Sequence, residues 1–503
     1  MNDSAHRNVF YLLLALIGMI AMAIILYSTN WGIGLFGRDS FNYISAARNL
    51  ARGLGYVFSL DNNTVAPITH YPPLLSMVLA AFEIAGTDAL ITARYLNALL
   101  FGLSAMLTGT LIYRTTKSEA FSLLGALFFS SMVIFIELHS WALSEPLFLF
   151  FMLLGFLLFD KFNTKNKLVT LIGLSVVLGL CFLTRYVGIA NIVSIMLVIM
   201  VIGVGSLKKR LFDSTIIAVI SIAPVFLWTY RNYALTKTIN NRNIGFYPPS
   251  LKNYISAFHT FFTWYLPDKI VVGFEKFYFY LFIVLIMGIA IAVLAYGYRK
   301  HGKAFHLIHS IRHVHPLNLV YICYAAIYSG VVLFSKVFID PGTGMSDRIF
   351  SPVLLASMLI VVSLLAFVWR SNYKIGRLLV ILLSVYLFGF FISSSVAALP
   401  KFHANGLGLG KKALQNSEAM HLLKDLAKDK DIYSNDTFAI YFYTGQRGYR
   451  RSSFSPDSIQ DDEVIVAIFG DSEGEAFYGK YAEYLELVQS DQVVSVYVFS
   501  RAR

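Results

Sequence analysis

The sequence predicts an α-helical protein that crosses a membrane many times and carries a small α/β domain at its C-terminal end. Three observations support this fold class. The 503 residues are 57% hydrophobic and only 14% charged, and their mean hydropathy is +0.64, which is not the composition of a soluble globular domain. Long apolar runs recur, each near the roughly 20 residues that a helix needs to cross a bilayer. From residue 401 onward these runs stop, and helix and strand patterns alternate.

On this criterion we expect about eleven membrane-spanning helices. They lie roughly at residues 8–30, 88–112, 119–137, 142–160, 168–184, 187–206, 212–230, 274–298, 316–338, 349–369 and 377–399. The first apolar run, Val9 to Tyr27, is too long for the core of a typical signal peptide and lacks a clear cleavage site. We therefore expect it to be an uncleaved signal anchor.

Basic residues predict the orientation of these helices, because cytoplasmic loops carry an excess of Lys and Arg. Five clusters follow alternate helices and so fall on one face of the membrane, which we assign to the cytoplasm: Arg114 and Lys117; Lys161, Lys165 and Lys167; Lys208, Lys209 and Arg210; Arg299, Lys300, Lys303 and Arg312; Arg370, Lys374 and Arg377. The N-terminus is then cytoplasmic. The loops at 31–87 and 231–272 and the C-terminal domain are extracytoplasmic, and the membrane is the cell membrane.

The charge distribution gives no reason to expect nucleic-acid binding. The net charge is +12, but residues 401–503 are net −3, so the excess of positive charge lies in the first 400 residues, as in other basic membrane proteins. Cys181 and Cys323 lie inside apolar runs and suggest neither a disulfide framework nor a metal site. Five histidines in the loop at 299–315 favour a solvated basic loop over a metal site, so we assign no metal. The sequence indicates no cofactor and leaves a divalent cation open.

The first outer loop contains a short amphipathic helix pattern. Apolar residues recur at helical spacing from Phe41 to Leu50, and Gly53 and Gly55 are expected to end the helix. Asp39 stands at its start, and the pair Pro72-Pro73 fixes the return into apolar sequence. The C-terminal tail is expected to hold an amphipathic helix over 413–426 and strands starting at Asp431, over 464–469 and over 493–499.

Two acids and three arginines are predicted at the outer edge of the membrane: Asp39, Glu145, Arg185, Arg231 and Arg348. Each has an ordinary structural explanation, since an acid can begin or end a helix and an arginine can reach lipid headgroups. Together they suit a lipid-phosphate donor whose headgroup reacts outside the membrane. Arginines hold phosphate by paired hydrogen bonds, and an acid can take the proton from an acceptor hydroxyl or amine.

The order of several motifs resembles the GT-C superfamily of membrane glycosyltransferases. It is most similar to the branch that contains the dolichyl-phosphate-mannose protein mannosyltransferases and the aminoarabinose transferase acting on lipid A. The motifs are GRDSFNYISAARNLARGLGY, HYPPLL, ALSEPLFLFF, LTRYVG and DRIFSPVL, within residues 8–400. The resemblance implies that Asp39 is the key carboxylate, that Glu145 is a second catalytic one, and that the donor is a sugar on polyprenyl phosphate.

Two positions depart from the patterns of this family. The mannosyltransferases commonly have Glu where this chain has Ser40, and the lipid A branch has a phosphate-binding Lys where this chain has Tyr71. We therefore include Tyr71 and the adjacent His70 with the three arginines as candidate residues for binding the donor.

We thus expect a transmembrane GT-C-like catalytic core over residues 1–400 and an extracytoplasmic α/β domain over 401–503. The resemblance implies a hexosyl- or pentosyltransferase that inverts the sugar carbon. Its partners would be a polyprenyl-phosphate-linked sugar, a lipid, glycan or protein acceptor, and membrane lipids. The alternatives are a flippase for a lipid-linked sugar and a ligase that moves a whole oligosaccharide. A transporter would place its charges near the membrane midplane on interrupted helices, whereas these lie at one edge.

Overall fold

The computed structural model describes residues 3–59, 65–239, 242, 244–248, 250–271, 277, 314–371, 374–428, 430–459 and 464–500. Within them, seven helices are long and apolar enough to cross a membrane: α1 (Asp3–Ser28), α4 (Ala89–Thr116), α7 (Glu145–Lys165), α10 (Leu207–Thr236), α15 (Pro316–Phe338), α16 (Asp347–Arg370) and α17 (Lys374–Asn405). The protein is therefore a multi-pass membrane protein, as predicted. The expected span at 274–298 lies outside the described residues.

The expected span at 119–137 is not one straight helix. It is a pair, α5 (Glu119–Ser131) and α6 (Val133–His139), bent by 60°. The break lies at Met132, whose backbone is extended. Two consecutive serines before it turn their hydroxyls back onto the helix, Ser130 to the carbonyl of Ala126 and Ser131 to that of Leu127, and such bonds bend helices.

Two further expected spans are shorter than 18 residues. They are α8 (Leu168–Thr184) and α9 (Ile189–Ile202), with 17 and 14 residues. Arg185, whose backbone is extended, and the single 3₁₀ turn η1 (Tyr186–Gly188) separate the two helices. The described part of the chain thus holds seven spanning helices, or eight if the bent pair counts as one span.

Glycines allow the N-terminal helix to pack closely into the bundle. A Cβ atom added at Gly102 of α4 would lie 2.6 Å from the carbonyl oxygen of Gly18 on α1. Small residues at such crossings let two backbones approach, which is a common way to pack helices in a membrane. The main apolar core then runs through the bundle and includes large aromatic side chains with almost no exposure, among them Phe101, Phe156 and Tyr324.

The segment between α1 and α4, which the sequence predicts to be the first outer loop, forms a compact unit on the bundle. It contains α2 (Gly37–Ala51), the antiparallel strands β1 (Val57–Ser59) and β2 (Val65–Pro67), and α3 (Leu74–Ile84). The amphipathic helix is confirmed, since Phe41, Ile44 and Ala47 are buried. The turn after α2 uses Gly53 at φ +78°, a backbone conformation that side chains other than glycine rarely adopt. The second outer loop contributes α11 (Leu251–Thr263) and α12 (Asp268–Val271).

The C-terminal domain is an α/β unit built on a five-stranded sheet in the order β4-β3-β5-β7-β6. Strands β3, β4 and β5 are parallel, and β7 runs antiparallel to β5 and β6. The elements are α18 (Lys412–Gln415), α19 (Glu418–Leu426), β3 (Ile432–Ser434), α20 (Thr437–Thr444), β4 (Tyr449–Arg450), η3 (Arg451–Ser453), η4 (Pro456–Ser458), β5 (Val464–Phe469), α21 (Asp471–Tyr481), β6 (Leu485–Ser490) and β7 (Val494–Phe499). The expected strands near 431, 464–469 and 493–499 are confirmed.

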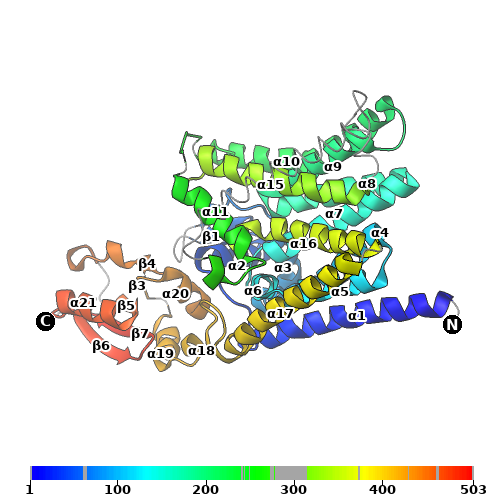
Figure 1. Cartoon of the computed structure of the whole chain (residues 1–503). Coiled ribbons are helices and arrows are strands. Elements are labelled where there is room, and N and C mark those ends of the chain that lie inside the picture. Colours follow the sequence, from blue (N-terminus) through cyan, green and yellow to red (C-terminus); the bar gives the residue numbers. More distant parts are fainter. Residues whose placement is uncertain are drawn as a thin grey trace.

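The C-terminal domain lies at one end of the helical bundle, and the N-terminus lies at the other end (Figure 1). Helix α20 packs on α2. The ring centroid of Phe41 is 5.2 Å from that of Phe438 and 4.8 Å from that of Tyr441. The guanidinium of Arg447 lies over Phe41 and Phe58. Helix α2 is therefore held between the membrane helices and the sheet domain, and it carries Asp39.

Candidate active site

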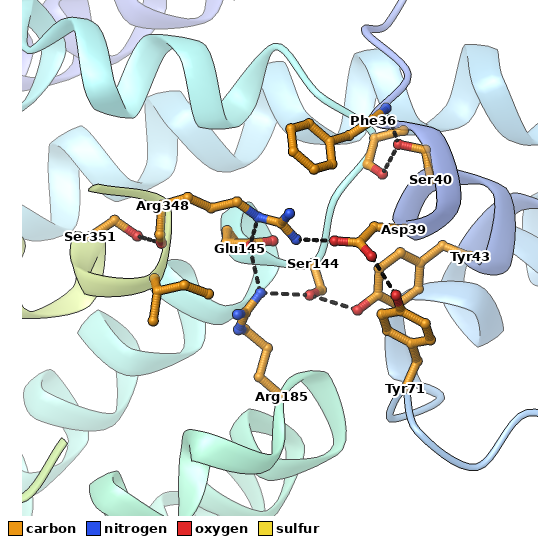
Figure 2. A network of polar contacts seen from close by, with 12 residues as sticks. Phe36, Asp39, Ser40, Tyr43, Tyr71, Ser144, Glu145, Arg185, Arg348 and Ser351 are labelled. Carbon is orange, nitrogen blue, oxygen red and sulfur yellow. Dashed lines mark hydrogen bonds and ion pairs between the residues drawn. The ribbon is translucent and has the colours of Figure 1, made fainter. Parts of the chain in front are cut away.

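Four charged side chains from distant parts of the sequence form one continuous chain of contacts (Figure 2). Arg348, in the first turn of α16, places Nη2 2.6 Å from Asp39 Oδ2 and Nε 2.6 Å from Glu145 Oε1. On the other side, Arg185 Nη1 lies 2.5 Å from the same oxygen of Glu145. The order is acid, arginine, acid, arginine. The network is therefore electrically balanced in the absence of a substrate, and α2, α7, α8 and α16 must all pack correctly to form it.

Glu145 occupies the protected centre of this chain. Its residue exposure is 1%, whereas the side chains of Asp39 and Arg348 are each 22% exposed. Its other oxygen, Oε2, has no hydrogen-bond partner among the described residues. Pro146 follows it in the first turn of α7, where a carboxylate is favoured by the helix dipole. Glu145 is thus placed to hold two arginines rather than to touch a substrate.

Asp39 is held on three sides. Its backbone N–H donates to the carbonyl of Phe36 at 3.1 Å, and Tyr71 donates its hydroxyl to Oδ1 while Arg348 holds Oδ2. Burial, followed by the negative charge of Asp39, raises the pKa of Tyr71 well above its ordinary value, so Tyr71 remains a neutral donor. The phenol of Tyr71, where the lipid A branch has a lysine, therefore orients the carboxylate.

The next residue, Ser40, connects two segments of the backbone through its hydroxyl group. It is fully buried, its hydroxyl donates to the carbonyl of Ala142 at 2.9 Å, and it accepts the N–H of Phe36 at 2.7 Å. These bonds fasten the start of α2 to the segment before α7. A second carboxylate at this position would be buried without a cation, which is costly.

A cavity of about 700 Å³ opens beside the charged chain. Its polar wall contains the acids Asp39 and Asp340, the cations Arg185, Arg242 and Arg348, and the rings of Tyr43, His70 and Tyr71. An apolar part of the wall comes from α15, with Val331, Val332 and Phe334. The cavity therefore offers cations to an anionic group and an apolar surface to a chain attached to it.

His70 also lines this cavity, and one of its ring nitrogens has no partner among the described residues. Its Nε2 is buried and makes no hydrogen bond with the described residues. Burial, and then the positive charges of Arg38 and Arg242, lower the pKa of His70 to about 4, while Asp39 opposes this shift. The imidazole is thus neutral near pH 7 and free to donate to, or accept from, a group that enters the cavity.

A second cavity, of about 690 Å³, lies between the bundle and the C-terminal domain. Its wall contains Arg38 and Asp39, the indole of Trp141, and Asp436, Phe469 and Gln492 of the sheet domain. Among the described residues that line the two cavities, Asp39 is the one that both share. Asp39 thus lies in the walls of two separate spaces.

Arg231 does not join this group. It donates to the carbonyls of Ile68 at 2.6 Å and Tyr56 at 2.9 Å, and its guanidinium lies 4.9 Å from the ring centroid of Trp228. It is not among the residues that line either cavity. The contacts of Arg231 therefore stabilise the segment that follows β2 and leads to His70.

Arg242 lies in the cavity wall, where we had expected Arg231. It lines the 700 Å³ cavity and pairs with Asp340 at the end of α15. The sequence offered only a weak signal, an arginine within the outer loop at 231–272. Among the described residues, no group of three or more His, Cys, Asp or Glu side chains comes together as a metal site would need.

Comparison with known proteins agrees with this architecture. Residues 56–239 match the family model of dolichyl-phosphate-mannose-protein mannosyltransferase. A search of curated proteins gives no significant match.

Solved structures match nearly the whole chain. ArnT from Cupriavidus metallidurans bound to undecaprenyl phosphate is 12% identical, with a TM-score of 0.56 over 100% of this chain and 99% of that one. The apo state of the same protein is 14% identical, with a TM-score of 0.51 over 98% of each chain. The Archaeoglobus fulgidus oligosaccharyltransferase in complex with Zn and sulfate is 12% identical, with a TM-score of 0.51 over 96% of this chain and 73% of that one. The chain therefore has the GT-C-like fold of these proteins, and residues 56–239 are similar to the dolichyl-phosphate-mannose-protein mannosyltransferase family, as its motifs predicted.

Proposed function

We propose that the protein transfers a sugar from a polyprenyl-phosphate carrier to an acceptor, with inversion at the sugar carbon. The observation that carries this proposal is the position of Asp39 between two cavities. An inverting transfer needs a donor and an acceptor on opposite sides of the reacting carbon, with a base beside the acceptor. An acid that lies in the walls of both spaces is positioned for this role.

The 700 Å³ cavity is the proposed donor site. Arg242, Arg185 and Arg348 supply positive charge for the phosphate, and the neutral His70 supplies one more hydrogen bond. The apolar wall of α15 suits the first units of a polyprenyl chain. That ArnT binds undecaprenyl phosphate in the same fold supports a donor of this chemistry.

The second cavity is the proposed acceptor site. In the reaction, the acceptor oxygen or nitrogen forms a bond to the sugar carbon, and the bond from that carbon to the phosphate oxygen breaks. The electron pair of the broken bond stays on the phosphate, where the arginines stabilise it. Asp39 takes the proton of the acceptor. Glu145 does not touch the substrates. It is a positioning residue that holds Arg185 and Arg348 in the wall of the donor cavity.

The proposed location is the cell membrane, with the N-terminus in the cytoplasm and residues 401–503 outside. In this orientation the site lies at the outer edge of the bundle. The same position argues against a flippase, which would carry its charges near the midplane on interrupted helices. Asp39, Glu145 and Arg348 come instead from the first turns of α2, α7 and α16, and Arg185 directly follows α8.

The test compares cell-envelope glycans, glycolipids and glycoproteins, by mass spectrometry, in cells with the wild-type gene, without the gene, and with Asp39→Asn. The proposal expects one class of acceptor to lose a single sugar residue in both altered strains. Envelope profiles that are the same in all three strains would exclude it. Normal glycosylation with Asp39→Asn but not without the gene would favour the flippase.

A further inference from the structure

A basic cavity that the proposed reaction does not use lies at the end of α17. It has a volume of about 580 Å³, and its wall contains Lys401, Phe402, Asn405, Gly406, Lys411, Lys412, Ala413 and Asn416. Three of these residues are cations and two are amides. None of the described residues in its wall is an acid.

The three lysines carry charges that the described residues do not neutralise. None of them forms an ion pair with a described residue, and all three are exposed. Other lysines differ, since Lys209 Nζ lies 2.8 Å from Asp213 Oδ2 and Lys336 Nζ donates to two carbonyls. Three unpaired positive charges around one cavity repel each other, and an anion between them would relieve that repulsion.

The cavity is formed before any ligand arrives. Gln415 donates to the carbonyls of Trp31 and Gly410, at 2.5 Å and 2.9 Å, which fixes the turn after α17. Gly406 has φ +67°, and a Cβ atom added there would lie 2.7 Å from the Gly410 oxygen. The turn therefore depends on glycine, and the lysine-bearing segment is held against the end of α1.

Its surroundings mark the edge of the membrane. Helices α1 and α17 both have the length and composition of membrane spans, and they end here. The ring of Tyr27 stacks on His403 with centroids 4.0 Å apart, and Lys412 Nζ lies 5.2 Å from the ring centroid of Trp31. Aromatic side chains collect at the level of lipid headgroups, and the anions at that level are lipid phosphates.

We infer that this cavity binds the phosphate headgroup of an anionic phospholipid, which fastens the first residues of the C-terminal domain to the membrane surface. Lys411 and Ala413 line both this cavity and the 690 Å³ cavity that reaches Asp39. A lipid bound here would thus stabilise one wall of the space between the bundle and the sheet domain.

The test is lipid binding by the purified full-length protein in non-ionic detergent. Native mass spectrometry measures retained lipid during titration with phosphatidylglycerol, phosphatidylcholine or inorganic phosphate. The triple variant Lys401→Gln, Lys411→Gln, Lys412→Gln is expected to need roughly 100-fold more phosphatidylglycerol for half saturation, since each lysine near an anionic surface contributes about a factor of five. Each single variant should show about the fivefold effect.

The matched control removes the same charge elsewhere on the C-terminal domain, with Lys424→Gln, Lys428→Gln and Lys480→Gln. It should bind phosphatidylglycerol as the wild type does. An unchanged titration of the first triple variant, or an equal loss in the control, would refute the site. Inorganic phosphate binding as tightly as phosphatidylglycerol would show a soluble anion as the ligand and overturn the lipid assignment.

Discussion

Arg348 Nη2 lies 2.6 Å from Asp39 Oδ2, although the two residues are far apart in the sequence. Asp39 belongs to the first turn of α2 and Arg348 to the first turn of α16. The same guanidinium also holds Glu145, so one arginine connects an accessible carboxylate to a buried one. Asp39 lines both cavities, whereas Glu145 lines neither. Removal of the charge at Asp39 is therefore expected to affect activity, and removal of the charge at Glu145 is expected to affect stability.

Asp39→Asn should abolish most activity while the protein still folds. The amide keeps the size of the side chain and loses the proton acceptor, and positioned acid–base groups typically contribute about 10²–10⁴-fold to turnover. Turnover is measured with purified protein and the polyprenyl-linked sugar identified from the envelope analysis. Asp425→Asn, on an exposed face of α19, is the control and should be normal. Turnover of Asp39→Asn within a few-fold of wild type, at equal protein level, would remove Asp39 as the base.

Glu145→Gln should instead reduce stability. Removing one partner of a buried ion pair costs about 3–5 kcal/mol, because the remaining charge stays buried without compensation. The thermal unfolding midpoint in detergent should fall clearly, and Glu475→Gln on the exposed side of α21 should leave it unchanged. The double variant Glu145→Gln, Arg185→Gln should recover part of the loss, since it also removes the stranded cation. If the double variant instead loses as much stability as Glu145→Gln and Arg185→Gln together, the two residues are not coupled through their contact.

The sequence allowed prediction of the elements whose signal is local. Seven of the expected membrane spans, the amphipathic pattern from Phe41 onward, and the strands expected at 464–469 and 493–499 depend on neighbours in the chain, and the described residues contain them. Strand β6 was not expected, because it is an edge strand whose middle residues are exposed, and such a strand has no clear pattern of apolar residues.

Contacts between distant segments could not be predicted in the same way. The sequence grouped Arg231 with Arg348 because both end or begin a helix on one face of the membrane. Arg231 in fact binds two backbone carbonyls, whereas Arg348 binds two carboxylates, and this difference depends on how residues 31–87 fold against the helices. Arg242 was missed for the same reason, since its position is set by Asp340, about a hundred residues further along the chain.

The orientation of the protein can be tested with one cysteine. Cys181 and Cys323 are replaced by Ser, and Lys424→Cys is introduced on the exposed face of α19. The five basic clusters place residues 401–503 outside, so a membrane-impermeant maleimide should label this cysteine in intact cells. Lys117→Cys is the control. Lys117 follows the C-terminal end of α4 and belongs to a basic cluster assigned to the cytoplasm, so this cysteine should react only after the membrane is opened. The reverse pattern would overturn the proposed orientation.

Arg231, near the end of α10, and Arg242, in the segment after it, should differ in their effects on donor binding and on stability. Arg242→Ala should raise the KM for the donor by roughly 10- to 100-fold, because a hydrogen bond to a charged group contributes about 1.5–3 kcal/mol. Arg231→Ala should chiefly lower the unfolding midpoint, since it leaves the carbonyls of Ile68 and Tyr56 without their donor. Donor titrations and thermal unfolding of both variants make the comparison. A larger KM effect in Arg231→Ala than in Arg242→Ala would reverse these assignments.

His70 should make the stability of the protein depend on pH. Its pKa is lowered to about 4 by burial and by Arg38 and Arg242, while in the unfolded chain it is near 6.5. Between these values the unfolded chain binds a proton that the folded protein does not. Stability is therefore highest above pH 6.5 and falls as the pH drops from 6.5 toward 4. His70→Gln removes this contribution, so its unfolding midpoint should fall less than that of the wild type between pH 6.5 and 4.5.

A bound donor should reduce the same dependence on pH. The phosphate adds negative charge beside His70, offsets Arg38 and Arg242, and so raises the pKa of the folded state toward that of the unfolded chain. The unfolding midpoint is measured across this pH range with and without polyprenyl phosphate, for the wild type, His70→Gln, and His421→Gln on the exposed surface of α19. Ligand should flatten the wild-type curve and leave the shape of the His70→Gln curve unchanged. If ligand leaves the shape of the wild-type curve as it was, the phosphate does not sit beside His70.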